Sequence, residues 1–589
     1  MEAGTAVPPA LRARRELIGA MPAVSMVLAR LGFDAIVAAH LPRPDPRCAL
    51  DAATVTGVLV RNLATGRQPL YGLADWAAGY EPAQLGLAPG QAALCNDDRA
   101  GRALDALSGA DRASMMTALT LAAVRGYQVS AGELHNDSTS LALYGAYRPA
   151  GGAARDGGAA AGGDAGGAPR QPPRPARGFS KDHRPDLKQL VWILTVSADG
   201  FVPFTARMAD GNTGDDATHV QTWEECRAIA GTPGFLYVAD SKLATGASMA
   251  HIDSRHGRFV TVLPRSRAED TAGRAAIAAA RLDFQLTRTR PGRRASDPPR
   301  TWETAAAPGP SAEGWPVIWV RSSAKCALDA RARADRITRA TTALDQLAAR
   351  LGSPRCKLKT HAAIARAADQ AITAAAAGRW VSYAITGHDT ITRKQVSTGR
   401  PGPNTRYQNI TVTRYALHPA TDTALAARDA ASDGCFPLIT NDKTLTPAQV
   451  LDAYKRQPGI EPRHHTFKTV LRAVPVHLTS PERIDALSFC LYAALLVHAL
   501  LERQLRRAAT AAGLPPLPLY HENRQAPAPS GALILAELSD IAVTTITTPR
   551  RATVVPPELT TLQQQLITLL GIPAASYHQQ HHKQARKSA

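Results

Sequence analysis

Three acidic residues stand in sequence surroundings that suit metal-dependent chemistry on phosphate: Asp137, Asp240 and Glu461. Hard divalent cations such as Mg²⁺ prefer carboxylate oxygens and keep several waters. Two such ions, roughly 3.5–4 Å apart, activate the attacking oxygen and stabilise the leaving oxygen in an in-line displacement at phosphorus. Three converging carboxylates are therefore enough to cleave and join phosphodiesters, and no His or Cys ligand is required.

Each acid also has a structural interpretation. Asp137 lies in the polar run HNDST, which suits a turn, and Asp240 precedes Ser-Lys, which suits a helix N-cap. Glu461 is compatible with an exposed helix position. The ordered set favours the catalytic interpretation over these three. Four further acids are rival metal ligands, but they fall in predicted loops at the wrong ends of the strands: Asp182, Asp186, Asp215 and Asp216.

Side chains that can hold phosphate lie near all three acids. The segment 178–189 forms a charged entry to a predicted strand, Lys242 follows the second acid by two residues, and the segment 454–468 surrounds the third. Salt-bridged scaffold residues would give a similar pattern. The DNA-binding candidates are Lys181, His183, Arg184, Lys188, Lys242, Tyr454, Arg456, Gln457 and Lys468.

The elements between residues 128 and 264 are predicted to position the first two acids. Residues 128–137 resemble a strand that runs out into a polar tip at Asp137, and Asp240 follows the short apolar strand 235–239. The remaining predicted elements are strands at 188–197, 201–208 and 258–263, with a hairpin turn at 198–200, and helices at 219–229 and 243–252. The order is that of a ribonuclease-H-like α/β fold, with acids at the first and fourth strands and Glu461 on a helix laid across them.

The predicted domains divide the chain into five parts. Residues 1–127 are a helical, DNA-end-binding domain, for which docking or dimerisation is the alternative. Residues 128–264 are the first part of the core, with a disordered Gly/Pro-rich loop at 150–177. Residues 433–510 are its second part, which begins with a turn and cap at 433–441 and holds the Glu461 helix and a buried apolar helix, 484–501. Residues 511–589 form a C-terminal region with a helix near 559–570 and a basic tail, 578–587.

The insertion domain, 265–432, is strongly basic. Residues 265–360 contain 19 Lys/Arg against 9 Asp/Glu, a net of +10 out of the chain's +19. This charge favours an insertion that grips DNA, while a solvated helical face is the alternative. Its predicted elements are a strand at 316–321, a helix at 328–351, a further helix, strands near 380–385 and 409–417, and a helix at 420–431.

Composition favours an intracellular protein with a polyanionic partner. The chain has 589 residues, a formal charge of +19 and a pI of about 9.9. Its seven cysteines contain no CxxC pair, which indicates a reducing compartment and argues against a zinc ribbon. The N-terminus lacks signal-peptide features, and the longest apolar run, 486–501, is shorter than the ~18–20 residues of a membrane span.

These motifs together resemble a DDE transposase of a bacterial insertion sequence. The resemblance covers most of the chain, including residues 69–76, 96–99, 135–139, 178–189, 238–242, 263–265 and 433–441. It is greatest to the branch with a large insertion between the second Asp and the Glu, whose signature is Tyr-x2-Arg-x3-Glu-x6-Lys. Tyr454, Glu461 and Lys468 match this signature, whereas Gln457 replaces the Arg and Arg456 lies beside it.

The resemblance implies a ribonuclease-H-like core in which Asp137, Asp240 and Glu461 bind two Mg²⁺ ions, with Mn²⁺ as a substitute. It further implies binding to terminal inverted repeats, cleavage at the element ends and joining of the 3′-OH to target DNA. The expected form is a homodimer or higher assembly on double-stranded DNA, in the bacterial cytoplasm and associated with the nucleoid. Two alternatives remain: a catalytically silent DNA-binding remnant, and a stand-alone nuclease of the same fold.

Overall fold

The computed structural model describes residues 12–578 apart from 45, 67, 146, 148–170, 293, 295, 352, 354, 474–477 and 549–550, and it forms two compact units. Unit 1 combines residues 1–261 with 453–589, and unit 2 is residues 262–452. Both mix helices with strands, which confirms the α/β class. Most of the predicted tail at 578–587 and most of the predicted loop at 150–177 fall outside the described residues.

A mixed five-stranded arrangement organises unit 1. Its order is β4 (Pro203–Ala209), β3 (Lys188–Ser197), β2 (Glu133–Leu143), β5 (Leu236–Val238) and β6 (Arg258–Val262). The pairs β4–β3 and β3–β2 are antiparallel, whereas β2–β5 and β5–β6 are parallel. The apolar run of β3 is almost wholly buried, as expected for an interior strand. The predicted hairpin turn between β3 and β4 is confirmed.

Two helices connect the parallel strands: α7 (His219–Ala230) leads from β4 to β5, and α8 (Gly246–Ser254) leads from β5 to β6. Both lie close to the predicted positions. The predicted loop before β3 is corrected at its end, because the backbone of Ala176 exchanges two hydrogen bonds with Gln189, at 3.2 and 2.9 Å. This short bridge fixes the entry to β3.

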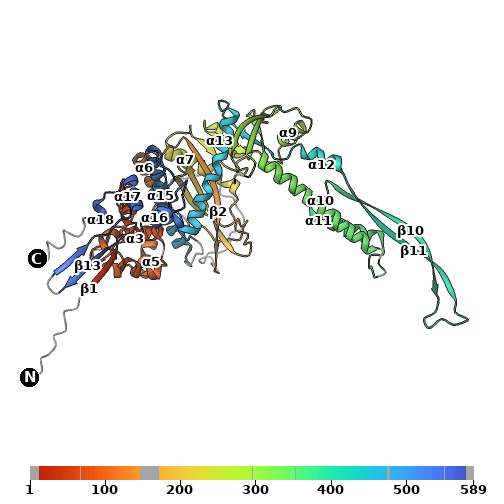
Figure 1. The fold of residues 1–589 in the computed structure, drawn as a ribbon, viewed down its shortest axis with the longest axis horizontal. Helices are drawn as coiled ribbons and strands as arrows, with labels where there is room; N and C mark the ends of the chain where they lie inside the picture. The colour runs from red at the N-terminus through yellow and green to blue at the C-terminus, as the bar shows by residue number, and fades with distance from the viewer. Residues whose placement is uncertain are drawn as a thin grey trace, which may run out of the picture. The chain divides into compact units, whose positions relative to one another are not determined.

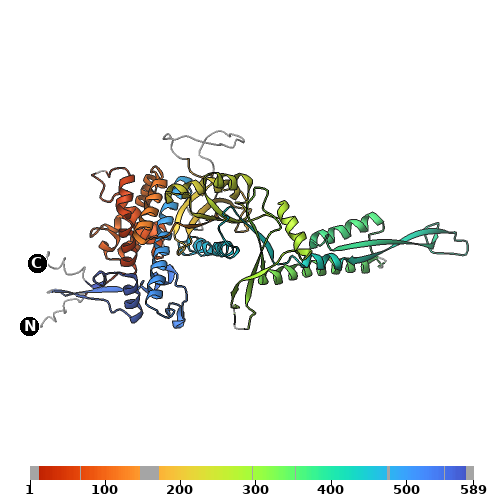
Figure 2. The ribbon, with the colours of Figure 1, turned by 90° about the horizontal axis from the view of Figure 1, so that it is seen from above.

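The largest apolar core of unit 1 forms around α15 (Pro481–Ala511), which packs on α3, α5 and α6 (Figure 2). The helix is long and apolar enough to cross a membrane, but its apolar window is entirely buried within the fold. A helix that is apolar on all sides is typical of a protein interior. The predicted buried helix is therefore confirmed. The helices before the sheet are α1 (Met21–Arg30), α2 (Phe33–His40), α3 (Ala52–Thr65), α4 (Leu73–Ala78), α5 (Asp97–Ser108) and α6 (Arg112–Tyr127).

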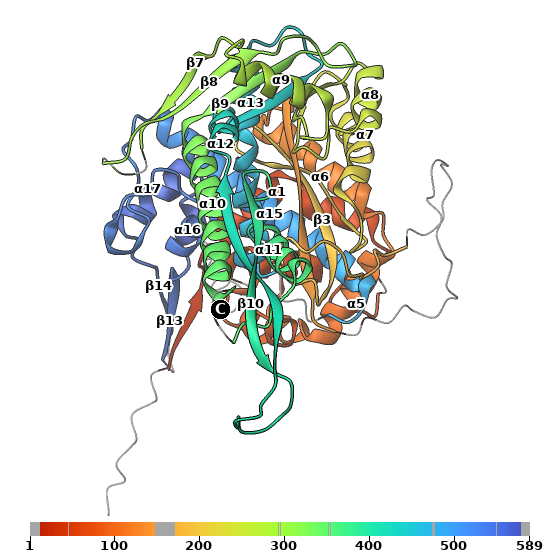
Figure 3. The same cartoon turned by 90° about the vertical axis from the view of Figure 1, so that its right-hand side faces the viewer.

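The two ends of the chain meet in a small antiparallel sheet that the sequence did not predict. Its order is β1 (Arg12–Leu17), β13 (Ala542–Thr548) and β14 (Arg551–Val555), and Figure 3 shows these strands side by side. Since β1 has the sequence RARREL and is mostly exposed, it carries no alternating apolar pattern. The C-terminal helices are α16 (Gly531–Glu537), α17 (Thr561–Leu570) and α18 (Ala575–His578).

Unit 2 contains four antiparallel strands, in the order β12 (Cys435–Thr440), β9 (Val317–Ser322), β8 (Arg300–Ala306) and β7 (Gln285–Arg290). The prediction of a turn and cap at 433–441 is wrong for all but its first two residues. Gly434 adopts a positive φ of 71°, and the six residues after it form β12, which pairs with β9. The strand is short and contains Pro437, so its pattern was weak.

A second core in unit 2 joins two helices to a long β-ribbon. The helices are α10 (Ser323–Leu351) and α11 (His361–Ala375), and the ribbon consists of β10 (Val381–Gln395) and β11 (Tyr407–Thr421) (Figure 1). A narrow apolar stripe on α10, formed by Ala340, Leu344 and Leu347, is buried against these elements. The remaining helices of the unit are α9 (Ala268–Ala278) and α12 (Thr423–Ala430).

Candidate functional site

The register of two parallel strands aligns the first two predicted acids. His135 of β2 pairs with Val238 of β5, and Asp137 and Asp240 each follow their paired residue by two positions. Since neighbouring parallel strands advance by the same length per residue, the two carboxylates leave the sheet at the same level. The sequence predicted this adjacency, and the strand register supplies the reason for it.

The prediction that Asp137 lies at a polar tip is wrong, because it lies inside β2. The residues around it, including Asn136, Ser138 and Thr139, are polar but buried. The pairing of β2 with β5 covers only Glu133 to His135, while its pairing with β3 continues to Leu143. Asp137 is therefore in an ordered strand and still next to an edge that β5 leaves open.

Lys181 links Asp137 to a third carboxylate, that of Asp215. The Lys181 ammonium lies 3.5 Å from an oxygen of Asp137 and 3.2 Å from an oxygen of Asp215. It also donates to the carbonyl and hydroxyl oxygens of Ser138, at 2.7 and 2.8 Å. The Ser138 hydroxyl in turn donates to Asp215. The Lys181 ammonium thus holds the carboxylates of Asp137 and Asp215 and the backbone of β2 at Ser138 in place.

His464 approaches Asp137 from the helical segment that also carries Glu461. Its Nε2 atom lies 3.4 Å from an oxygen of Asp137, and the His464 ring is buried. Burial raises the pKa of Asp137, but the close contact with His464 and the charge of Lys181 outweigh burial, so the net pKa is lowered. Asp137 is therefore held ionised, as a ligand for cations must be.

Asp240 has the opposite electrostatic environment. Burial and the negative charges of Asp137 and Asp215 raise its pKa, against a backbone hydrogen bond from Lys242 and the charge of Lys181. Its Oδ1 accepts that bond from the Lys242 amide at 3.0 Å. Three like charges within electrostatic range form a site where an added cation would be favourable.

The helical segment after residue 446 is broken into short pieces. It consists of α13 (Pro447–Arg456), a 3₁₀ turn (Gln457–Ile460), α14 (Glu461–His465) and a π-helical turn (Thr466–Val470). Pro458 and Pro462 lack an amide hydrogen, so a continuous α-helical ladder cannot pass through them. The junction residues Arg456, Ile460 and His465 keep right-handed helical φ and ψ, so the segment changes its hydrogen-bonding pattern while it stays helical.

Gln457 of the signature and its neighbour Arg456 attach this segment to β2. The Gln457 amide lies 2.9 Å from Nδ1 of His135 and donates to the carbonyl of Asn136 at 2.7 Å. Arg456 forms two 2.6 Å hydrogen bonds to the carboxylate of Glu133. Glu133, His135 and Asp137 share one face of the strand, because alternate residues point the same way. The segment thus covers the face that carries Asp137.

Glu461 itself is exposed at the first position of α14. Neither an ion pair nor a hydrogen bond joins it to Asp137 or Asp240 in the part of the chain that the structure describes. Likewise, no group of three or more His, Cys, Asp or Glu side chains in the described residues is arranged to hold a metal ion. Asp137 and Asp240 nonetheless offer the hard oxygen donors that Mg²⁺ prefers.

The other predicted DNA-binding residues differ in their surroundings. Burial and the charge of Asp240 raise the pKa of Tyr454, which places this residue near the second acid. Several cations already have partners: Arg184 binds Asp186, Lys188 donates to the carbonyl of Tyr147, and Lys468 binds Asp182. His183 and Lys242 are exposed. The pairing of Asp182 and Asp186 with cations also lowers their value as rival metal ligands.

Asp215 and His464 contribute to the site although the sequence did not select them. Asp215 was ranked low as a loop residue at the wrong strand end, but its 3₁₀ turn (Asp215–Thr218) brings it to Ser138 and Lys181. The signal available in the sequence was the pair Asp215-Asp216 after Gly214, directly before a helix. His464 falls three residues after Glu461, a spacing that places both near one side of a helix.

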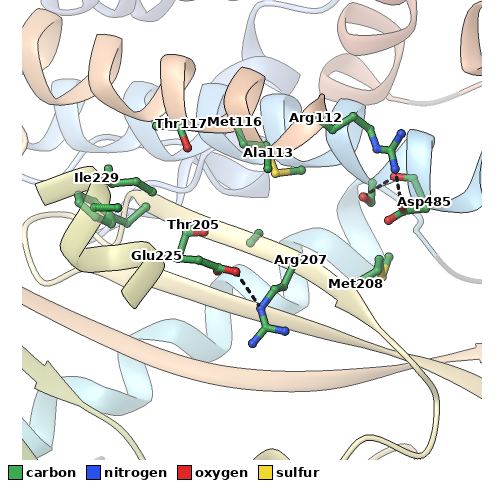
Figure 4. Close-up of a pocket in the computed structure, with 14 residues that line it drawn as sticks. Arg112, Ala113, Met116, Thr117, Thr205, Arg207, Met208, Glu225, Ile229 and Asp485 are labelled. Carbon is green, nitrogen blue, oxygen red and sulfur yellow. Dashed lines mark hydrogen bonds and ion pairs between the residues drawn. The ribbon is translucent and has the colours of Figure 1, made fainter. Parts of the chain in front are cut away.

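A separate pocket of unit 1 lies among β4, α6, α7 and α15, and Figure 4 shows it. It contains none of the predicted acids. Its charged side chains are paired with each other: Arg112 with Asp485, and Arg207 with Glu225 at 3.5 Å. These pairs account for the charge in the pocket without a ligand.

Comparison of the chain with protein-family models and with curated proteins found no match.

Proposed function

We propose that this protein is a DNA transposase with a ribonuclease-H-like core. The observation that carries the proposal is the register of β2 and β5, which aligns Asp137 with Asp240. The strand order β4-β3-β2-β5-β6, with helices before and after β5, agrees with the order expected from the sequence. The acids stand on the first and after the fourth strand of this order, as the resemblance to DDE transposases implies.

Each residue of the site has a role in this proposal. Asp137 and Asp240 are the principal metal ligands, and Glu461 is the third acid. When bound, two Mg²⁺ ions, or Mn²⁺ in their place, would activate the attacking oxygen and stabilise the leaving oxygen. Lys181 and His464 keep Asp137 ionised. Gln457 orients the segment that carries Glu461 against β2.

The substrate of the proposed reaction is double-stranded DNA. The protein binds the terminal inverted repeats of its element, cleaves at the ends and joins the 3′-OH to target DNA, as a homodimer or higher assembly. Its net charge of +19 supports a polyanionic partner. The proposed location is the bacterial cytoplasm, in association with the nucleoid. The complete burial of the apolar window of α15 is consistent with a core helix rather than a membrane anchor.

Two other functions make different predictions. A catalytically silent DNA-binding remnant would bind the ends without any metal-dependent product. A stand-alone nuclease would cut DNA without strand transfer. The test is incubation of wild type and the Asp240→Asn variant with Mg²⁺ and DNA that carries the element's ends. Wild-type cleavage and joining that Asp240→Asn abolishes would support the transposase, while cleavage without joining would favour the nuclease.

The identity of the third acid is tested by two matched substitutions, Glu461→Gln and Asp215→Asn. We expect Glu461→Gln to abolish strand transfer, because the signature assigns it to the metal site. Asp215 binds Lys181 and Ser138, so it acts as a positioning residue, and Asp215→Asn should reduce the rate without abolishing it. Full activity in Glu461→Gln together with none in Asp215→Asn would make Asp215 the third acid.

A further inference from the structure

The β10–β11 ribbon of unit 2 extends well beyond the core that anchors it. Its two strands pair antiparallel over their whole length, from Val381–Thr421 to Gln395–Tyr407. Near the base, Val381 and Leu417 are buried against α10 and α11. Residues 386–414, which we call the distal ribbon, are exposed on both faces except at positions 395, 405 and 410.

Stability of the fold does not account for the distal ribbon. An isolated two-stranded ribbon is marginally stable in water, and it contributes no apolar core. Ile391 is nevertheless 72% exposed and Val412 43% exposed. Cross-strand pairs of β-branched residues, such as Ile391 with Thr411 and Thr390 with Val412, keep the ribbon in extended form. The ribbon thus presents a preformed surface.

The net charge of this surface is positive. Five cations belong to the distal ribbon, and the one acid, Asp389, accepts a hydrogen bond from Thr413 at 2.8 Å. Within the described residues, none of the five cations forms an ion pair with an acid. Arg393 instead lies over the ring of Tyr407, at 4.6 Å from its centroid. The five cations are Arg393, Lys394, Arg400, Arg406 and Arg414.

The dimensions of the distal ribbon suit a groove of double-stranded DNA. At about 3.3 Å per residue, residues 386–395 extend roughly 33 Å. One turn of B-DNA rises about 34 Å. The major groove, about 12 Å wide, admits a two-stranded β-ribbon, whereas the minor groove is only about 6 Å wide. Arg393 and Lys394 on β10 and Arg414 on β11 would then lie beside the phosphates at the groove edges, while Arg400 and Arg406 lie in the loop that joins the strands.

We propose that the distal ribbon lies in the major groove of duplex DNA and that its five cations contact the phosphates. The inference rests on the proposed function for the identity of the DNA, but the binding itself does not require any catalysis. It assigns DNA binding to a part of the insertion domain that lies outside the basic segment 265–360.

The test compares the full-length protein with a variant in which all five cations are replaced by Gln. The probe is a 40-base-pair duplex of arbitrary sequence, and binding is measured over a range of salt concentrations. Each lost phosphate contact lowers the slope of log affinity against log salt by about 0.9, so five contacts lower it by about 4.5. We expect at least tenfold weaker binding and the loss of guanine N7 protection, since N7 faces the major groove.

Two further variants control for net charge and for folding. The matched control replaces five exposed cations elsewhere, Arg227, Arg255, Lys443, Arg507 and Arg524, and should bind much as the wild type does. A Lys-for-Arg variant at Arg393, Arg400, Arg406 and Arg414 should retain most of the binding, because phosphate contacts depend on charge. Equal losses in the ribbon variant and the matched control would overturn the proposal. So would protection of adenine N3 in the minor groove, or a loss of dimer with unchanged DNA binding.

Mg²⁺-dependent strand cleavage of separate duplexes that carry the element's ends distinguishes this inference from the proposed function. If the wild type protects guanine N7 in a way that depends on the five cations but does not cleave, the transposase proposal is refuted and DNA binding by the distal ribbon is supported. If the wild type cleaves, and the variant that lacks the five cations binds DNA and protects guanine N7 normally, only the proposal for the distal ribbon is refuted.

Discussion

A buried ion pair holds the segment that carries Glu461, and its removal is expected to destabilise that part of unit 1 by about 3–5 kcal/mol. Arg463 lies 2.7 Å from Glu502 of α15, and the two side chains are 2% and 5% exposed. Arg463 also donates to the carbonyls of Phe201 and Gly200, at 2.8 and 3.0 Å. Arg463→Met leaves these acceptors and the Glu502 carboxylate without their principal donor. Since Glu502 keeps the Gly531 amide and Arg506 at 3.3 Å, we expect a loss near the lower end of that range.

Hydrogen exchange of the amides in α14 and α15 measures this loss, because it reports the free energy of local opening. Arg102→Met is the matched control: its pair with Asp98 is 66% and 64% exposed, and exposed helical pairs contribute about 0.3–0.5 kcal/mol. The double variant Arg463→Met with Glu502→Gln should recover part of the loss, since it removes the unpaired charge. A loss below about 1 kcal/mol in Arg463→Met, or additive losses in the double variant, would refute the reasoning.

Two more predictions concern the acids of the site. Because burial and neighbouring carboxylates raise the folded-state pKa of Asp240, this group stabilises the fold only below its unfolded pKa, and that contribution is lost as pH rises through the folded pKa. Asp240→Asn should therefore raise the melting temperature at pH 7 without Mg²⁺, give no gain near pH 3, and abolish strand transfer; a lower melting temperature at pH 7 would contradict this account. Burial raises the pKa of Asp137 while His464 and Lys181 lower it, so Lys181→Met should raise that pKa and move the acid limb of the pH–rate profile to higher pH. An unmoved limb would show that Asp137 does not control it.

Apolar pattern predicted the strands and helices that carry it, and failed where polar residues form ordered structure. The buried run of β3 and the apolar helix α15 were recognisable because burial on all sides leaves a continuous apolar signal. In contrast, β1 is charged and exposed, and its pairing with β13 joins residues more than 500 positions apart. Local sequence contains no trace of such a partner.

The candidate site shows the same division. Asp137 and Asp240 were correctly predicted to be neighbours, because the predicted strand order places the two strands that position them side by side. The extension of β2 through the polar residues around Asp137 was missed, since buried polar residues resemble a turn in a sequence. The approach of Asp215 depends on the 3₁₀ turn between β4 and α7, and that of His464 on the attachment of its helical segment to β2 through Gln457. Both are tertiary features that spacing alone does not determine.

The most direct test of the proposed function is a joining assay with Mg²⁺ on DNA that carries the element's own ends. It compares wild type with Asp137→Asn, Asp240→Asn and Glu461→Gln. We predict metal-dependent joining of the 3′-OH ends by the wild type and its loss in all three variants, each of which still binds the DNA. Joining that survives in Asp137→Asn or Asp240→Asn, or DNA binding without any joining by the wild type, would contradict the assignment of these acids to a transposase active site.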